Sequence, residues 1–424
     1  MNKKILTVGI IILMIAAVTA AAILFIFPYG PNQPPKADDS GSTQQGIQQV
    51  VNANNQFAFD LYSELDKSEN ENIFYSPYSI SAALAMTYEG AKGQTADEIK
   101  SVFHFPESNI LRPNFAAIYN DINGVNEAYE SRTGNALWVQ QDSPLLEDYT
   151  TKVEKYYGGK AANLDFIEET EKSRQTINAF IEEQTNNKIK DLIAPGVLDA
   201  LTRLVITNAI YFKGTWEWEF DSSDTDEREF KITPDNIIQV PMMLMNPEKT
   251  TFNYADTENL QILELPYKGG NLSMLIILPK GNIESIKSSL TAEKLAELKG
   301  KMQETDLDAI YLPKFEFDTK YSLNEYLKAL GMPTAFDDGG KADFSGMTLA
   351  EKLFIGLVIH QAYVKVDEKG TEAAAATAVV MKLATMAPTF EPIIFKADHP
   401  FIFVIQEKET GNILFLGKVT DPTK

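Results

Sequence analysis

The chain has 424 residues, of which 44% are hydrophobic, so it is long enough to bury a large core. Its 38 basic and 59 acidic residues give a net charge of −21, and this repulsion argues against nucleic acid or a heparin-like polyanion as a partner. The sequence contains no cysteine, which excludes disulfides, zinc–thiolate sites and a thiol nucleophile.

The N-terminus predicts export from the cytoplasm. Lys3 and Lys4 precede an uncharged run that ends at residue 27, and about 20 apolar residues suffice to span a bilayer. Because the lysines would stay inside, the rest of the chain is expected outside the cell, secreted or tethered to the outer face of the membrane. Residues 1–27 are therefore predicted to be a membrane anchor, or a signal peptide cleaved near residues 20–22. Residues 28–48, rich in Pro, Gly, Ser and Gln, are typical of a flexible tether.

Residues 49–424 contain no linker-like stretch and no internal repeat, which indicates one large domain. Thr95 and Glu98 have the spacing of a capping box, which predicts a short helix starting there. Apolar residues recur at helical spacing in the segments 55–67 and 171–189, and 76–90 is expected to be a helix of small residues that ends at Gly90.

Strands are predicted mainly in the second half. Residues 202–214 are β-branched and aromatic, and 271–279 are apolar on both faces, as in a central strand. A long strand is expected within 352–370, and a closing hairpin over 400–419 with its turn at 410–412. Early helices and late strands, without βαβ alternation, predict an α+β fold with large sheets.

No catalytic constellation is found. His104, His360 and His399 are the three histidines, and no G-x-S-x-G nucleophile motif accompanies them. Phosphate-binding and dinucleotide-binding glycine motifs are missing, as is the ligand spacing of a zinc site. Acidic residues are so common that a glycosidase-like pair is not excluded by counting. We therefore expect neither enzymatic activity nor a cofactor or metal.

Two polar residues interrupt strands that otherwise look buried. Asn208 and His360 would be costly there unless they are hydrogen-bonded, so a satisfied core network is the simplest interpretation. Trp216 is expected to pack in the core or at the end of a sheet.

The segment 370–390 fits two structures at once. Ala373 to Ala384 has high helix propensity. Read as a strand, its odd-numbered side chains from Thr371 to Leu383 form one uncharged face. A segment that fits both states is typical of one that changes state.

Four motifs follow one another along the chain: NIFYSPYSISAALAMTYEGAKGQTADEI, TNAIYFKGTWEWEF, VDEKGTEAAAATA, and FKADHPFIFVI with ILFLGKV. Together they resemble the serpins, the serine protease inhibitor superfamily, from about Gln48 to the C-terminus. The resemblance implies a single monomeric domain, 49–424, with three β-sheets, eight or nine helices and an exposed reactive-centre loop.

In that family a serine protease attacks the loop and forms its acyl-enzyme, after which the cleaved loop inserts into the main sheet and traps the protease. The resemblance implies a reactive bond between Ala384 and Thr385, which suits elastase-like or subtilisin-like proteases. Lys382 would instead suit trypsin-like proteases, and Leu383 or Met386 chymotrypsin-like ones.

The resemblance also assigns two groups of residues. The hinge comprises Glu368, Gly370, Thr371, Glu372, Ala373, Ala374, Ala375 and Ala376. The sheet-opening network comprises Ser76, Ser79, Asn208, His360 and Trp216. The alternative function is a non-inhibitory serpin that binds or stores a ligand, although such members often carry bulky, charged or proline residues in the hinge.

Overall fold

The chain divides into two units, Met1–Lys36 and Ala37–Lys424. The expected anchor and the bait segment lie outside the residues that are described. None of the helices in the described part is long and apolar enough to cross a bilayer. The computed structural model describes residues 36–68, 71–123, 129–247, 250–287, 289–349, 353–371 and 392–424.

The folded unit starts at Ala37 rather than at residue 49, so the expected tether 28–48 is too long. Helix α2 begins at Gln44, and the hydroxyl of Thr43 accepts a hydrogen bond from the N–H of Gly46 in its first turn. Upstream, Ala37 is 2% exposed and its backbone exchanges two hydrogen bonds with the Asn120 side chain. The polar composition hid these contacts, because they are made with residues far along the chain.

Nine α-helices occur in the described residues, which agrees with the eight or nine expected. In α3, Ser76 caps the first turn by accepting the N–H of Ser79, and Pro77 occupies the first helical position. The helices are α2 (Gln44–Ser68), α3 (Pro77–Gly90), α4 (Gly93–Val102), α5 (Ser108–Ile122), α6 (Glu147–Tyr157), α7 (Thr170–Gln184), α8 (Glu284–Lys287), α9 (Ala292–Lys301) and α10 (Asn324–Leu330).

The capping box predicted at Thr95 is wrong. Helix α4 begins two residues earlier, at Gly93. The Thr95 hydroxyl accepts the N–H of Asp343 at 3.0 Å. The Glu98 carboxylate accepts the N–H and the hydroxyl of Thr334. Both side chains therefore bind another part of the chain instead of the backbone N–H groups at the start of the helix.

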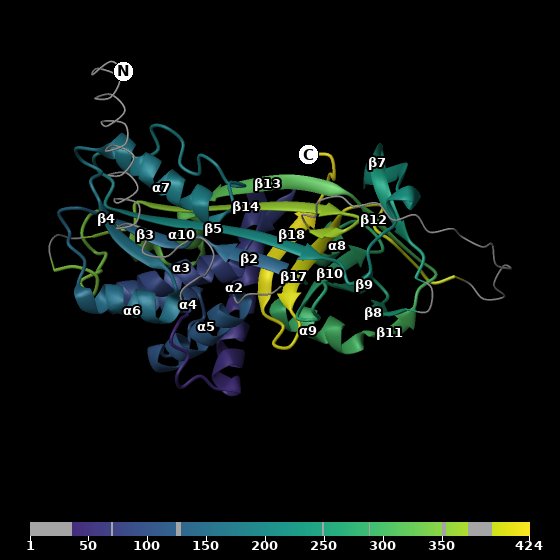
Figure 1. The fold of residues 1–424 in the computed structure, drawn as a ribbon, viewed down its shortest axis with the longest axis horizontal. Coiled ribbons are helices and arrows are strands. Elements are labelled where there is room, and N and C mark those ends of the chain that lie inside the picture. The colour runs from purple at the N-terminus through teal and green to yellow at the C-terminus, as the bar shows by residue number, and fades with distance from the viewer. Residues whose placement is uncertain are drawn as a thin grey trace, which may run out of the picture. The chain divides into compact units, whose positions relative to one another are not determined.

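Three sheets make up the rest of the domain, as expected (Figure 1). The main sheet has the order β13 (Phe315–Ser322), β14 (Leu357–Asp367), β15 (Gly370–Thr371), β5 (Leu204–Thr215), β3 (Ala136–Gln140) and β4 (Lys160–Leu164), with β2 (Tyr129–Thr133) paired to β5. The second has the order β1 (Ile73–Tyr75), β18 (Ile413–Val419), β17 (Phe401–Glu407), β10 (Leu272–Pro279), β9 (Leu260–Pro266), β8 (Thr251–Asp256) and β11 (Gln303–Asp306). The third has the order β16 (Ile394–Lys396), β12 (Ala309–Pro313), β7 (Asn236–Met245) and β6 (Asp226–Thr233).

Two strand predictions are confirmed in detail. Strand β10 is buried along its whole length and lies in the middle of the second sheet. Strands β17 and β18 form the closing hairpin, and Gly411 in its turn has a φ of +76° that suits glycine.

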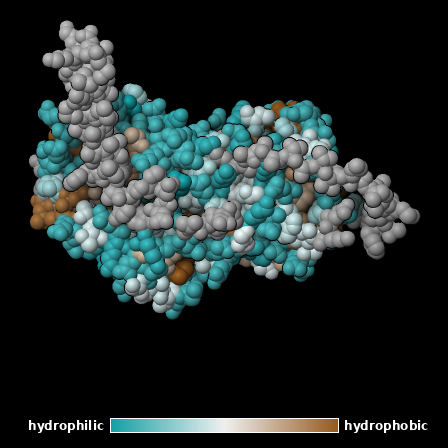
Figure 2. All heavy atoms as spheres, viewed as in Figure 1, coloured by the Kyte–Doolittle hydropathy of each residue, from teal (hydrophilic) through white to brown (hydrophobic). Residues whose placement is uncertain are grey.

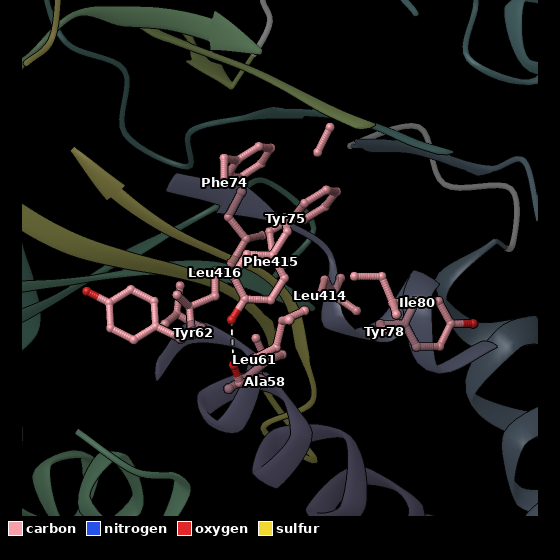
Figure 3. Packing of buried hydrophobic residues seen from close by; sticks show 14 of the residues in the cluster. Ala58, Leu61, Tyr62, Phe74, Tyr75, Tyr78, Ile80, Leu414, Phe415 and Leu416 are labelled. Carbon is pink, nitrogen blue, oxygen red and sulfur yellow. Dashed lines mark hydrogen bonds between the residues drawn. The ribbon is translucent and has the colours of Figure 1, made fainter. Parts of the chain in front are cut away.

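The core joins α2 to the second sheet. Phe57, Leu61 and Leu65 are fully buried on one side of α2, which confirms the helical spacing. Figure 3 shows this packing, in which the Tyr75 hydroxyl donates to the carbonyl of Ala58. The outer surface in the view of Figure 2 is mostly hydrophilic, in keeping with the many charged residues.

Helices cover both faces of the main sheet. Adjacent residues of β5 point to opposite faces. Thr207 accepts a hydrogen bond from Trp138, whose ring packs edge-on against Phe180 of α7. Asn208 points the other way and donates to Ser79 of α3. The space behind Asn208, on the α3 side, holds the polar cluster described next.

Candidate functional site

The main sheet is joined at one end and split at the other. Strands β14 and β5 pair in parallel from Leu357–Val205 to Ala362–Ile210, and we call these six pairs the seam. Beyond the seam, β15 lies between the two strands. Its Thr371 pairs with Val366 on β14 and with Gly214 on β5.

Close contact fixes the conformation of β15. Gly370 has a φ of +150°, and a Cβ at this position would lie 2.0 Å from the carbonyl oxygen of Gly214, so only glycine fits. The next side chain, Thr371, is 2% exposed, and its hydroxyl lies 2.6 Å from that of Tyr267. The side chain of Thr371 therefore lies on the buried face of the sheet. The alternation of side chains along 371–383 places it on the uncharged face.

Trp216 braces the turn between β14 and β15. Its indole N–H donates to the carbonyl of Asp367 at 3.1 Å, and its backbone N–H donates to the carbonyl of Lys369 at 2.8 Å. The ring stacks on Tyr267, with centroids 4.6 Å apart and an interplanar angle of 10°. Trp216 thus holds the turn between β14 and β15 in place at this end of the main sheet.

Glu368 fastens the same turn to the third sheet. Both of its carboxylate oxygens lie within 3.1 Å of the Lys314 ammonium, and one accepts the Thr225 hydroxyl at 2.9 Å. Burial alone would raise the pKa of this carboxyl, but the bonds from Lys314 and Thr225 hold it below its usual value. Glu368 is therefore an ionised anchor for the hinge.

A buried polar cluster crosses the seam at its third pair from the hinge. The N–H of Ser76 donates to Nε2 of His360, and Nδ1 of His360 bonds Oδ1 of Asn208. The Asn208 amide donates to Ser79 Oγ and to Asn135 Oδ1, both at 2.6 Å. Ser79 completes the cluster by donating to Asn135 at 2.9 Å.

These bonds define the protonation of His360. Because Nε2 accepts a hydrogen bond, the ring proton lies on Nδ1 and is donated to Asn208. Burial lowers the pKa of His360 to about 3, so the ring is neutral near pH 7. The cluster therefore joins the two halves of the sheet without an ionised group.

The structure brings together four of the five residues expected in the sheet-opening network. Trp216 lies at the far end of β5, against the hinge, and is not part of the cluster. Asn135 belongs to the cluster and was missed, because an Asn after a Gly reads as an ordinary turn residue. Residues 372–376 of the hinge and the bond 384–385 lie outside the described residues.

The contacts of the hinge were also missed. Tyr267, Lys314 and Thr225 meet it from 104, 54 and 143 residues away, and no local pattern signals such pairing. His104 and His399 bond Asp60 and Asp398, respectively, away from the seam. Among the described residues no group of three or more potential ligands could hold a metal ion.

Residues 52–422 match the family model described as Serpin (serine protease inhibitor). The chain is a serpin. It is 44% identical over 379 residues to an uncharacterized serpin-like protein of Methanosarcina acetivorans, covering 88% of each chain. It is also 38% identical to leukocyte elastase inhibitor A of Rattus norvegicus, covering 89% of this serpin and all of the relative.

Among solved structures, this serpin resembles human thyroxine-binding globulin complexed with thyroxine. The TM-score is 0.80 at 32% identity, over 89% of this chain and all of the other. The serpin fold predicted from the motifs, with three sheets, is therefore confirmed.

Proposed function

We propose that this serpin inhibits a serine protease as a suicide substrate, and that it is not an enzyme. The observation that carries the proposal is the position of β15, which already occupies a strand position between β14 and β5. Protease cleavage further along the loop would free the following residues to extend this strand into the seam. The acyl-enzyme would then be trapped before it hydrolyses.

The register of β15 supports insertion in one particular alignment. If the antiparallel pairing continues, each further residue moves one position back along both β14 and β5. Four positions on, Ala375 falls opposite the first pair of the seam, Ala362 and Ile210. Six positions on, Thr377 falls opposite His360 and Asn208, on the same face as Thr371. A hydroxyl would thus reach the polar cluster at the point where its seam-crossing bond must break.

We infer that the bait bond is Ala384–Thr385 and that the target has a small first pocket. Support comes from the small side chain of Ala384 and from the relative that is named leukocyte elastase inhibitor. An elastase-like protease fits both observations, and a subtilisin-like protease fits the small side chain. The alternative bait residues Lys382, Leu383 and Met386 would direct the inhibitor to other classes.

We further propose that the inhibitor acts as a monomer outside the cell, held by residues 1–27 or released after their cleavage. The charge pattern of this segment, with Lys3 and Lys4 before the apolar run, supports the orientation. A location outside the cell would bring the loop into contact with secreted proteases.

The deciding experiment mixes the domain from Ala37 onward with elastase, subtilisin, trypsin and chymotrypsin, followed by denaturing electrophoresis. A complex that survives SDS supports the inhibitor. Cleavage of the loop without a complex would favour the non-inhibitory alternative, a binding or storage role such as that of the thyroxine-bound relative. The control is a sample cleaved beforehand within the loop, which has no intact bait and should trap nothing.

A further inference from the structure

A single Asn-X-Ser/Thr sequence occurs in the chain, at Asn271-Leu272-Ser273. This tripeptide is the acceptor motif for N-linked glycans in exported proteins. Short motifs of this kind arise by chance, so the position of the asparagine in the fold decides whether the motif is usable.

Asn271 stands at an open turn between β9 and β10. The residue is exposed, and no hydrogen bond of its side-chain amide to the described residues is found. The two preceding glycines have φ values of +88° and +75°, and a Cβ at Gly270 would meet no atom within 4 Å. The Asn271 side chain is therefore open to solvent, as the acceptor of a glycan must be.

Ser273 is different, because it is fully buried. Its hydroxyl donates to Glu264 at 2.7 Å and accepts the amide of Gln406 at 3.2 Å. A transferase must read the hydroxyl of this residue, so it can act only before the β9–β10 hairpin closes. In the finished fold the asparagine stays outside while the rest of the motif is enclosed.

We propose that Asn271 carries an N-linked glycan, added during export and before folding. The amide nitrogen attacks C1 of a lipid-linked oligosaccharide, forming the N–C1 bond. The bond from C1 to the lipid phosphate breaks, and the phosphate leaves with the bonding electrons while the amide gives up one proton. This inference rests on the proposed location outside the cell.

The neighbours of Asn271 indicate what the glycan does. Its carbonyl accepts the N–H of Lys408, which is exposed in the β17–β18 turn, and Lys268 lies three residues before it. Both lysines are cleavage sites for trypsin-like proteases. A glycan between them shields the two turns. It does not affect the hinge contact of Tyr267 with Thr371, because that contact is buried.

The test expresses the full chain in insect cells and measures the intact mass and the glycopeptides. Wild type and Ser273→Thr should carry the glycan, whereas Asn271→Gln and Ser273→Ala should lose it. Asn271→Gln changes only an exposed side chain, so its folding is not in question. A control, Glu284→Thr, places a second acceptor motif at the exposed Asn282.

The control separates two kinds of failure. If Asn282 is modified in the Glu284→Thr variant while Asn271 is not, the proposed site is wrong. If neither is modified, the chain did not reach the transferase, and the proposed location falls together with this inference. Removal of the glycan should raise the rate of trypsin cleavage at Lys268 and Lys408 several-fold, and an unchanged rate would overturn the shielding role.

Discussion

Tyr267 and Thr371 are joined through their hydroxyls, 2.6 Å apart, although 104 residues separate them. Tyr267 also stacks on Trp216, which bonds the turn before Thr371. The first residue of the segment expected to insert is therefore already seated in the core. Loop insertion would therefore extend an existing strand. It would not have to form the first pairs of a new strand.

Replacing Thr371 by Arg tests this seat. The side chain is 2% exposed, so Thr371→Arg would bury a cation without a partner at a cost of several kcal/mol. We expect the loop to be cut at the same bond while the SDS-stable complex gives way to hydrolysis. The stoichiometry of inhibition, titrated against a fixed amount of protease, measures this shift.

The matched control is Glu372→Arg, one residue on, where the alternating pattern predicts the outer face. It should inhibit nearly as well as the wild type. Equal losses in both variants would show that the face assignment is wrong.

Reversing the charge of Glu368 should release the hinge. Glu368→Lys would place two ammonium groups together at Lys314 and remove the acceptor of the Thr225 hydroxyl. Because Lys314 is partly exposed, we expect the free energy of unfolding to fall by about 2 kcal/mol. This value lies between the costs of breaking a surface ion pair and a buried one. Urea unfolding followed by tryptophan fluorescence gives this value.

The double variant Glu368→Lys, Lys314→Glu restores the pair with opposite polarity. It should recover at least half of the lost stability. No recovery would mean that Glu368 acts through its backbone contacts, not through Lys314.

Acid should destabilise the native state through His360. Burial lowers its pKa from 6.5 to about 3, so between these values the unfolded chain binds a proton that the folded protein excludes. The contribution of neutral His360 to the free energy of unfolding is complete above pH 6.5. Below that pH it falls by about 1.4 kcal/mol per pH unit. At pH 4.5 the native state should be roughly 3 kcal/mol less stable from this group alone.

Carboxylates also titrate in acid, so the slope must be compared with a variant. His360→Gln keeps an acceptor for the N–H of Ser76 but does not titrate. Its unfolding free energy, measured by urea from pH 7 to 4.5, should decline less steeply than that of the wild type. Parallel curves would remove His360 as the source.

Cleavage of the loop should make the protein more stable. Insertion would add a row of strand hydrogen bonds and bury Val379, Met381 and Leu383, at about 0.8 kcal/mol per buried CH₂. We expect the melting temperature of the cleaved domain to exceed that of the intact one by more than about 10 °C. An ordinary protein gains nothing from a nick, so equal melting temperatures would leave the non-inhibitory alternative in the lead.

Mass spectrometry of the released C-terminal fragment locates the bait bond. After cleavage by elastase or subtilisin the fragment should begin at Thr385. A fragment that begins at Leu383 or Ala387 would move the bait to Lys382 or Met386.

Long regular elements were predictable from the sequence. Strands β5, β10 and β14 and the closing hairpin are long runs of β-branched, aromatic and other apolar side chains, so their local composition was enough to predict them. Strands β1 and β15, of three and two residues, are too short to show a period and exist only through their partners. The same limit explains the boundary at Ala37, which depends on contact with Asn120.

The site was half predictable. Asn208 and His360 stood out because a polar side chain in an apolar strand needs a partner. Their partner Asn135 did not stand out, and neither did Lys314 beside Glu368, since both lie in segments where polar residues are common. The resemblance to serpins supplied Ser76 and Ser79, and the structure supplied the bonds that connect them.

The position of the polar cluster along the seam has a consequence for timing. Two pairs of the seam, Ala362–Ile210 and Gln361–Ala209, lie between the hinge and the pair His360–Asn208. The side-chain bond of Gln361 goes to Asp318 on β13, so His360 and Asn208 form the first side-chain hydrogen bond across the seam that an entering strand meets. The bond between His360 and Asn208 would then control two rates. Strengthening this bond would keep the unused inhibitor active for longer. It would equally slow insertion of the cleaved loop, which must be faster than deacylation if a captured protease is not to escape.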